Sequence, residues 1–169
     1  MMSGFERLIN KVIIENDFPF VFVGDIPAYV FASRRPDFIH KDLYKCTRYN
    51  NEPLPEKNLF LIEFDSDLHN FERDLSRDCD YIVAGFKILS LKETNHECYL
   101  NVFHQLVINE KDCLDENDEY KLSKKIAIAI KMLLESKVTN KMKEIAREYL
   151  LEKQKEAFYQ LGKALSGTE

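Results

Sequence analysis

Near the N-terminus of the chain, apolar residues recur at helical spacing. They follow the i, i+3, i+4, i+7, i+8 pattern that places hydrophobic side chains on one face of a helix. Ser3 and Glu6 have the spacing of a capping box, in which the two side chains satisfy backbone amides at the start of a helix. We therefore predict an amphipathic helix over residues 4–16. Its apolar face consists of Phe5, Leu8, Ile9, Val12 and Ile13.

Between residues 20 and 108 the pattern changes to short apolar runs of the kind found in β-strands. We expect strands over residues 20–24 and 28–33, a less regular third strand over residues 43–49, and a fourth over residues 59–64. A charge-rich stretch follows the strand at 59–64. Its large apolar residues have helical spacing, which predicts a short surface helix near residues 67–77. They are Leu68, Phe71 and Leu75.

Two longer apolar runs, residues 81–91 and 98–108, lie on either side of a polar segment that contains Asn95. Two strands separated by a short polar turn usually form a hairpin. We therefore expect these runs to pair in antiparallel fashion near the centre of the sheet. Residues 109–119 carry an excess of carboxylates and are expected to form a loop.

Helical spacing returns at the C-terminus, where residues 121–165 predict two helices. The first contains the run from Ile126 to Leu134, which is apolar almost all round and is therefore expected to be deeply buried. Thr139 and Asn140 provide a break and a new N-cap. The second helix runs from about residue 141 to 165 and should be roughly 35 Å long at 1.5 Å per residue.

These elements predict a single α+β domain over residues 1–169. We expect a mostly antiparallel sheet of five to six strands, an N-terminal amphipathic helix and two C-terminal helices, the last one long. A chain of 169 residues is long enough to bury a full hydrophobic core, and its five glycines and five prolines do not suggest a linker.

Composition and charge narrow the functional classes. The net charge of −5 makes nucleic acid an unlikely partner, because binding to phosphates relies on clustered cations. No run approaches 18 apolar residues and no secretory signal is recognisable, so we expect a cytoplasmic protein without a membrane partner. The 17 lysines against 7 arginines indicate A/T-rich coding, as in many bacteria and bacteriophages.

The segment from Glu63 to His69 is the strongest candidate for chemistry, because acidic residues alternate at the end of a predicted strand. Every second side chain of a strand shares a face, so such residues can converge on one hard cation. A metal-dependent hydrolase or nuclease centred on Asp65, Asp67 and His69 is therefore the alternative function. The simpler interpretation is that these acidic residues offset the dipole at the start of the following helix.

Recognised catalytic motifs are not matched. Restriction-type nucleases pair a Pro-Asp with an acidic-x-Lys on a later strand, and this chain has Pro36-Asp37 but no such lysine motif on a later predicted strand. The sequence also contains no G-x-S-x-G, H-E-x-x-H or Walker-type loop, and its four cysteines have no C-x-x-C spacing. We therefore expect no catalytic residues, no metal and no cofactor.

A basic and aromatic segment from Arg34 to Arg48 is the only feature that favours nucleic acid, because cations interleaved with aromatic rings can bind single strands. The same composition also occurs at the edge of a sheet, where charge blocks pairing with another chain. Since the rest of the chain is acidic, we prefer the edge interpretation and keep a nucleic-acid binder as the second alternative.

The last helix provides the main functional expectation. Its apolar stripe continues almost to the end of the chain, where few local elements remain to cover it. We expect a non-catalytic protein–protein interaction module, such as an adaptor, a chaperone or an inhibitor, that binds a partner protein or forms a homodimer. The alternative is that the helix folds back across the sheet. The expected protein-binding residues are Phe158, Tyr159, Leu161 and Leu165.

Overall fold

The computed structural model describes residues 1–66, 70–92, 104–107 and 116–167. It contains four α-helices, five strands and a short 3₁₀ helix, η1, in these residues. In order they are α1 (Gly4–Glu15), β1 (Phe20–Phe22), β2 (Phe38–His40), η1 (Lys41–Leu43), β3 (Phe60–Asp65), α2 (Phe71–Val83), β4 (Lys87–Lys92), β5 (His104–Val107), α3 (Glu116–Glu135) and α4 (Asn140–Ser166).

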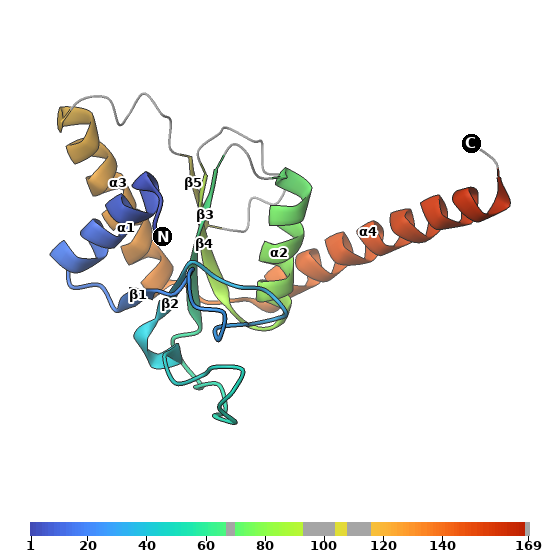
Figure 1. The fold of residues 1–169 in the computed structure, drawn as a ribbon, viewed down its shortest axis with the longest axis horizontal. Helices are drawn as coiled ribbons and strands as arrows, with labels where there is room; N and C mark the ends of the chain where they lie inside the picture. Colours follow the sequence, from blue (N-terminus) through green and yellow to red (C-terminus); the bar gives the residue numbers. More distant parts are fainter. Residues whose placement is uncertain (67–69, 93–103, 108–115, 168–169) are drawn as a thin grey trace.

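The strands form one sheet with the order β1-β2-β3-β4-β5. Helices cover both faces of this sheet (Figure 1). On one face, α1 and α3 pack over a core that includes Ile9, Ile62 and Leu89. On the other face, α2 and the first turns of α4 pack over a second core that includes Leu61 and Ile88. The result is an α+β fold with three layers.

The N-terminal helix is confirmed. Ser3 caps α1, and the capping box with Glu6 is complete. The predicted apolar face of α1 is buried at Leu8, Ile9 and Val12, as amphipathic spacing requires. The long last helix is also confirmed, because α4 spans 27 residues from an N-cap at Thr139.

The expected mostly antiparallel sheet is wrong. β1 pairs antiparallel with β2, and β2 with β3, but β3–β4 and β4–β5 are parallel. The expected antiparallel hairpin of residues 81–91 with 98–108 is wrong, because β4 and β5 pair in parallel. For β3 and β4, the error arises at residues 81–83, which form the last turn of α2 rather than the start of a strand. Because α2 carries the chain back along the sheet, β4 begins at the same end as β3 and must run parallel to it.

Two other expected strands are absent from the corresponding described residues. Residues 28–33 form turns with one isolated bridge between Phe31 and Arg34, and residues 43–49 follow η1 without strand structure. The strand β2 lies between these segments instead. The predicted turn at Asn95 lies outside the described residues. Both of these segments contain two aromatic residues, which favour strands by composition. In the structure, Tyr29 and Phe31 pack into the second core, whereas Tyr44 and Tyr49 are exposed.

The helix α3 begins at Glu116, inside the segment that was expected to be an acidic loop. Ile126, Ile130 and Leu133 are buried, whereas Ile128 and Met132 on the opposite face are more than half exposed. The helix is therefore buried on one side only, and the prediction of burial all round is wrong. None of the helices in the described part of the chain combines the length and apolar character needed to cross a membrane.

Candidate functional site

A cluster of charged side chains is buried between α2 and the C-terminal ends of β3 and β4. Glu63 and Asp65 alternate with apolar residues on β3, so both point towards α2. Ser90 and Lys92 do the same on β4, whose register pairs Asp65 with Lys92. The helix contributes a polar stripe at i, i+3, i+4 and i+7, a spacing that places all four side chains on one face. This stripe consists of Asp74, Arg77, Asp78 and Tyr81.

Arg77 holds this charge cluster together. Its two terminal nitrogens lie 2.8 and 3.1 Å from the two carboxylate oxygens of Asp65, which is a bidentate ion pair. The guanidinium also lies 2.7 Å from Asp78 and 3.4 Å from Asp74. A second cation, Lys92, lies 3.1 Å from Asp65. The cluster therefore combines several buried carboxyl groups with two cations.

Burial and neighbouring charges shift the pKa values in this charge cluster in opposite directions. Burial raises the pKa of Glu63 well above its usual value, although Arg77 lowers it in part. Burial also raises the pKa of Asp78. For Asp65, burial alone would raise the pKa, but Arg77 and Lys92 more than offset it and the pKa is lowered. Asp65 is thus the carboxylate that stays ionised, and Glu63 retains a proton more readily.

The Pro36-Asp37 pair lies beside this charge cluster. The backbone amide of Phe64 donates a 2.8 Å hydrogen bond to the Asp37 carboxylate, which fixes it next to β3. Burial raises the pKa of Asp37, and a hydrogen bond with Glu63 lowers it in part. The tertiary structure therefore brings Asp37 beside Glu63 and places Lys92 beside Asp65, although the linear acidic-x-Lys motif is missing.

Of the predicted metal-site residues, only Asp65 can be placed. Asp67 and His69 lie outside the described residues. Asp65 does not sit at a helix start, because α2 begins at Phe71 with Asn70 as its N-cap, so the helix-dipole interpretation of Asp65 is wrong. Within the described ranges, no group of three or more His, Cys, Asp or Glu residues is arranged to hold a metal ion.

Arg77, Ser90 and Lys92 were not predicted from the sequence as site residues. A usable signal was present, because Glu63 interrupts an apolar strand and a buried charge requires a partner. The i, i+3, i+4, i+7 stripe on α2 was a second signal, since its polar residues share a face with buried Leu75. What the sequence could not supply was which segments face one another.

The basic segment from Arg34 to Arg48 does not form a continuous cationic surface. Arg34 is paired with Asp80 at 3.0 Å, and His40 is buried on β2, where its ring accepts a hydrogen bond from the Asp42 amide. The edge interpretation is also wrong at His40, because β2 is an inner strand between β1 and β3. Only Lys41, Lys45 and Arg48 remain as exposed or half-exposed cations in the second part of the segment.

The predicted protein-binding residues lie together on the end of α4. Met142 and Ala146 near its start are buried against α2, and Lys153 forms a 3.0 Å ion pair with Glu72. Every residue from 154 to 167 is exposed. Figure 1 shows this part of the helix projecting away from the sheet. The alternative that α4 folds back across the sheet therefore applies to its first turns only.

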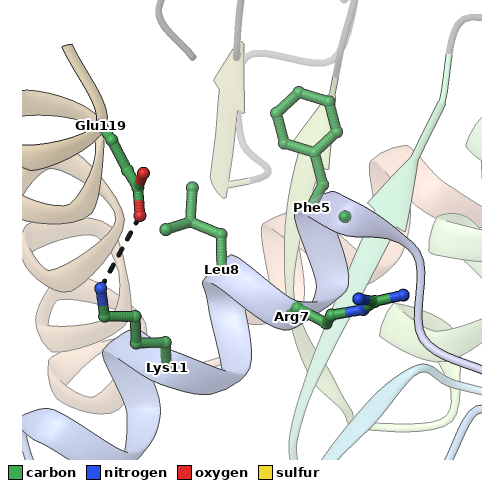
Figure 2. A pocket seen from close by; sticks show the side chains of 6 residues that line it. Phe5, Arg7, Leu8, Lys11 and Glu119 are labelled. Carbon is green, nitrogen blue, oxygen red and sulfur yellow. Dashed lines mark ion pairs between the residues drawn. The ribbon is translucent and has the colours of Figure 1, made fainter. Parts of the chain in front are cut away.

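A pocket of about 400 Å³ opens between α1 and α3 (Figure 2). Phe5 and Leu8 line it from α1, and an ion pair of 3.7 Å between Lys11 and Glu119 bridges the two helices. The ring of Phe5 also packs against Phe64 of β3, with 5.1 Å between the ring centroids. The wall is mostly hydrocarbon, and none of the candidate site residues predicted from the sequence lines it.

Comparison of the chain with protein-family models, with curated proteins and with solved structures finds no match in any of the three.

Proposed function

We propose that this chain is a non-catalytic protein-interaction module, acting as an adaptor, chaperone or inhibitor, and that the end of α4 is its binding surface. The observation that carries the proposal is the exposure of four large side chains on a helix end that contacts nothing else in the described structure. The exposed fractions are 64% for Phe158, 61% for Tyr159, 54% for Leu161 and 80% for Leu165.

The spacing of the exposed apolar residues supports binding along one side of the helix. Leu151, Phe158, Leu161 and Leu165 recur at intervals of seven, three and four residues, as in helices that pack into a groove or pair with another helix. Thirteen residues lie between Lys153, the last half-buried position, and Gly167, which corresponds to roughly 20 Å of helix. The projecting segment is long enough to present Phe158, Leu161 and Leu165 to a partner, and Leu151 continues the row just before it.

The physical argument for a partner has two parts. A helical segment of three to four turns without tertiary contacts is only marginally stable in water, so a partner would stabilise it. Burying each large apolar side chain would contribute about 1.5–3 kcal/mol, and a few such residues can hold a complex together. The partner is either another protein or a second copy of this chain.

The test is the double substitution Phe158→Asp with Leu161→Asp. A matched control, Gln160→Asp with Ser166→Asp, adds the same charge to the same segment but places it away from the apolar row. Light scattering measures the mass of each protein, and circular dichroism checks that the sheet is folded. Each protein is then used as bait for proteins from the native cell.

We expect the double variant to lose self-association or to lose the proteins that the wild type and the control both retain. A wild type that is monomeric and retains the same proteins as the double variant would refute the proposal. Unfolding of the double variant alone would also count against it, because an exposed surface can accept aspartate.

A second candidate function is metal-dependent hydrolysis of phosphodiesters by the charge cluster. The specific support is that Lys92 lies 3.1 Å from Asp65 while Asp37 lies beside Glu63, so an acidic pair and a lysine are assembled from three strands or strand ends. Arg77 weighs against it, because it occupies both oxygens of Asp65 that a metal would need. Magnesium-dependent cleavage of linear DNA by the wild type, lost in Lys92→Met, would support this candidate; no cleavage by the wild type would remove it.

A further inference from the structure

A second pocket lies at the opposite end of the sheet from the charge cluster, where β3 and β4 begin. It has a volume of about 800 Å³ and is bounded by the start of these strands, the C-terminal end of α3 and the connection into α4. Four lysines and two glutamates line it. They are Lys57, Lys87, Lys137, Lys143, Glu56 and Glu135. We refer to it as the lysine pocket.

Lys87 is the unusual member of this set. Only 5% of the residue is exposed. It is the first residue of β4, a strand in which all six residues are buried. Its ammonium group lies 3.5 Å from the thioether sulfur of Met142. A thioether is a weak acceptor, whereas an ammonium has three donors to satisfy. In the described part of the chain, Lys87 has no carboxylate partner.

This arrangement contrasts with the other buried cations. Arg77 and Lys92 are each paired with carboxylates at 2.7–3.1 Å, as burial of a charge requires. Lys87 lacks such a partner, and burial lowers its pKa. An anion entering the pocket would supply the missing acceptor and favour the charged ammonium.

The other lysines of the pocket are also available. Lys57 and Lys137 are exposed and Lys143 is half-buried, and none of the six charged residues forms an ion pair with another described residue. Four cations against two anions give the pocket a positive balance in a chain whose net charge is −5. A positively charged hollow concentrates anions locally.

The wall also has an apolar part. Leu59, Leu134 and Val138 line the pocket together with the lysines. Small-molecule sites typically combine apolar walls with a few placed polar groups, and their volumes are commonly about 300–1,000 Å³. The lysine pocket therefore has room for an organic molecule as well as for its anionic group.

We propose that the lysine pocket binds a small organic anion, with its phosphate or carboxylate group on the ammonium of Lys87. Lys137 and Lys143, which also line the pocket, attract the anion, while the apolar wall contacts its uncharged part. This site is separate from the end of α4 and does not depend on the protein-interaction function.

Pyrophosphate and citrate serve as probes, because they separate phosphate from carboxylate recognition. Isothermal titration is carried out on the full chain as wild type, Lys87→Met and Lys131→Met. Methionine fits the buried position and removes the unpaired charge, so Lys87→Met should melt no lower than the wild type. Lys131 is an exposed lysine of α3 that does not line the pocket, and its substitution controls for the general loss of one positive charge.

We expect the wild type to bind at least one probe with one site per chain. Lys87→Met should weaken that binding by about tenfold or more, while Lys131→Met should leave it almost unchanged. No binding of either probe to the wild type would overturn the proposal. Equal weakening in both variants would also overturn it, because it would show only general electrostatic attraction.

A measurement on the wild type alone guards against misfolding of the variant. Lysines are acetylated with and without the probe that binds, and the modified peptides are quantified by mass spectrometry. We expect the probe to reduce acetylation of Lys87 relative to that of Lys131. Unchanged labelling of Lys87 in the presence of the bound probe would overturn the assignment.

Discussion

Replacement of Arg77 by methionine would test the buried charge cluster directly. Methionine retains much of the aliphatic side chain but removes the charge and every hydrogen bond of the guanidinium. Four carboxyl groups within 4 Å of this guanidinium would then share one remaining cation, Lys92. These groups belong to Glu63, Asp65, Asp74 and Asp78.

The size of the expected loss of stability follows from the burial of Arg77 and its carboxylate partners. Removing one partner of a buried ion pair destabilises a protein by about 3–5 kcal/mol, because the other partner is left as an uncompensated charge. The Arg77 side chain is 11% exposed and those of its partners are 4% or less, so this range applies. Since a domain is stable by about 5–15 kcal/mol in total, Arg77→Met should be strongly destabilised at pH 7.

The loss of stability caused by Arg77→Met should be smaller at low pH than at neutral pH. Without Arg77, the buried carboxyl groups have higher pKa values in the folded chain than in the unfolded chain. The folded state then holds protons that the unfolded chain has released, so a lower pH favours folding by about 1.4 kcal/mol per proton and pH unit. The difference in the free energy of unfolding between Arg77→Met and the wild type should therefore become smaller as the pH is lowered from 7 to 5.

Urea unfolding followed by circular dichroism at several pH values provides the free energies. Arg73→Met is the matched control, because Arg73 lies one turn earlier on α2 and is exposed. We expect a change within about 0.5 kcal/mol for the control. A loss below about 1 kcal/mol for Arg77→Met at pH 7 would refute this account of the cluster, as would a loss that does not shrink at pH 5.

Two further predictions concern the wild-type fold. Burial raises the pKa values of Glu63, Asp78 and Asp37, so these three groups hold protons in the folded chain that the unfolded chain has released. Burial lowers the pKa of His40, which acts in the opposite sense below about pH 6.5, but three groups outweigh one and the free energy of unfolding should fall as pH rises from about 5 to 8. Asp65, whose pKa is lowered, is ionised in both states over that range, and a stability that rises with pH there would contradict the prediction. Ile126→Ala should lower the free energy of unfolding by about 2–5 kcal/mol, because Ile126 is fully buried. Ile128→Ala, on the exposed face of α3, should lower it far less. Equal losses of stability in chemical denaturation would show that α3 is buried all round.

Local patterns allowed several elements to be predicted from the sequence. The helix α1 follows from apolar spacing and the Ser3 cap, and α4 follows from Thr139 and a long run of helix-forming residues. The strand β3 follows from a short apolar run that only Glu63 interrupts. In each case the information lies within neighbouring residues, because caps and periodicity act over a few positions.

Strand direction was decided by tertiary structure. Residues 81–83 are apolar or aromatic and fit either a strand or the last turn of a helix. Such short runs are ambiguous by periodicity alone. They fold as helix because Tyr81 and Ile82 complete the face of α2 that packs on the second core. That choice makes the connection from β3 to β4 a helical crossover, so these two strands run parallel.

The partners of the charged residues were likewise decided only in three dimensions. The sequence shows that Glu63 lies in an apolar strand and must find a partner, but it does not show that Arg77 joins Asp65 or that Asp37 lies beside Glu63. Lys87 shows the opposite outcome, since it too lies in an apolar strand but is left facing a pocket.

The end of α4 combines both kinds of information. Its apolar row is readable in the sequence, because it repeats along a single helix. Whether that row is core or surface depends on which other elements reach it, and α2 reaches only as far as Lys153. Burial is a property of the whole packed chain, whereas periodicity belongs to the segment itself.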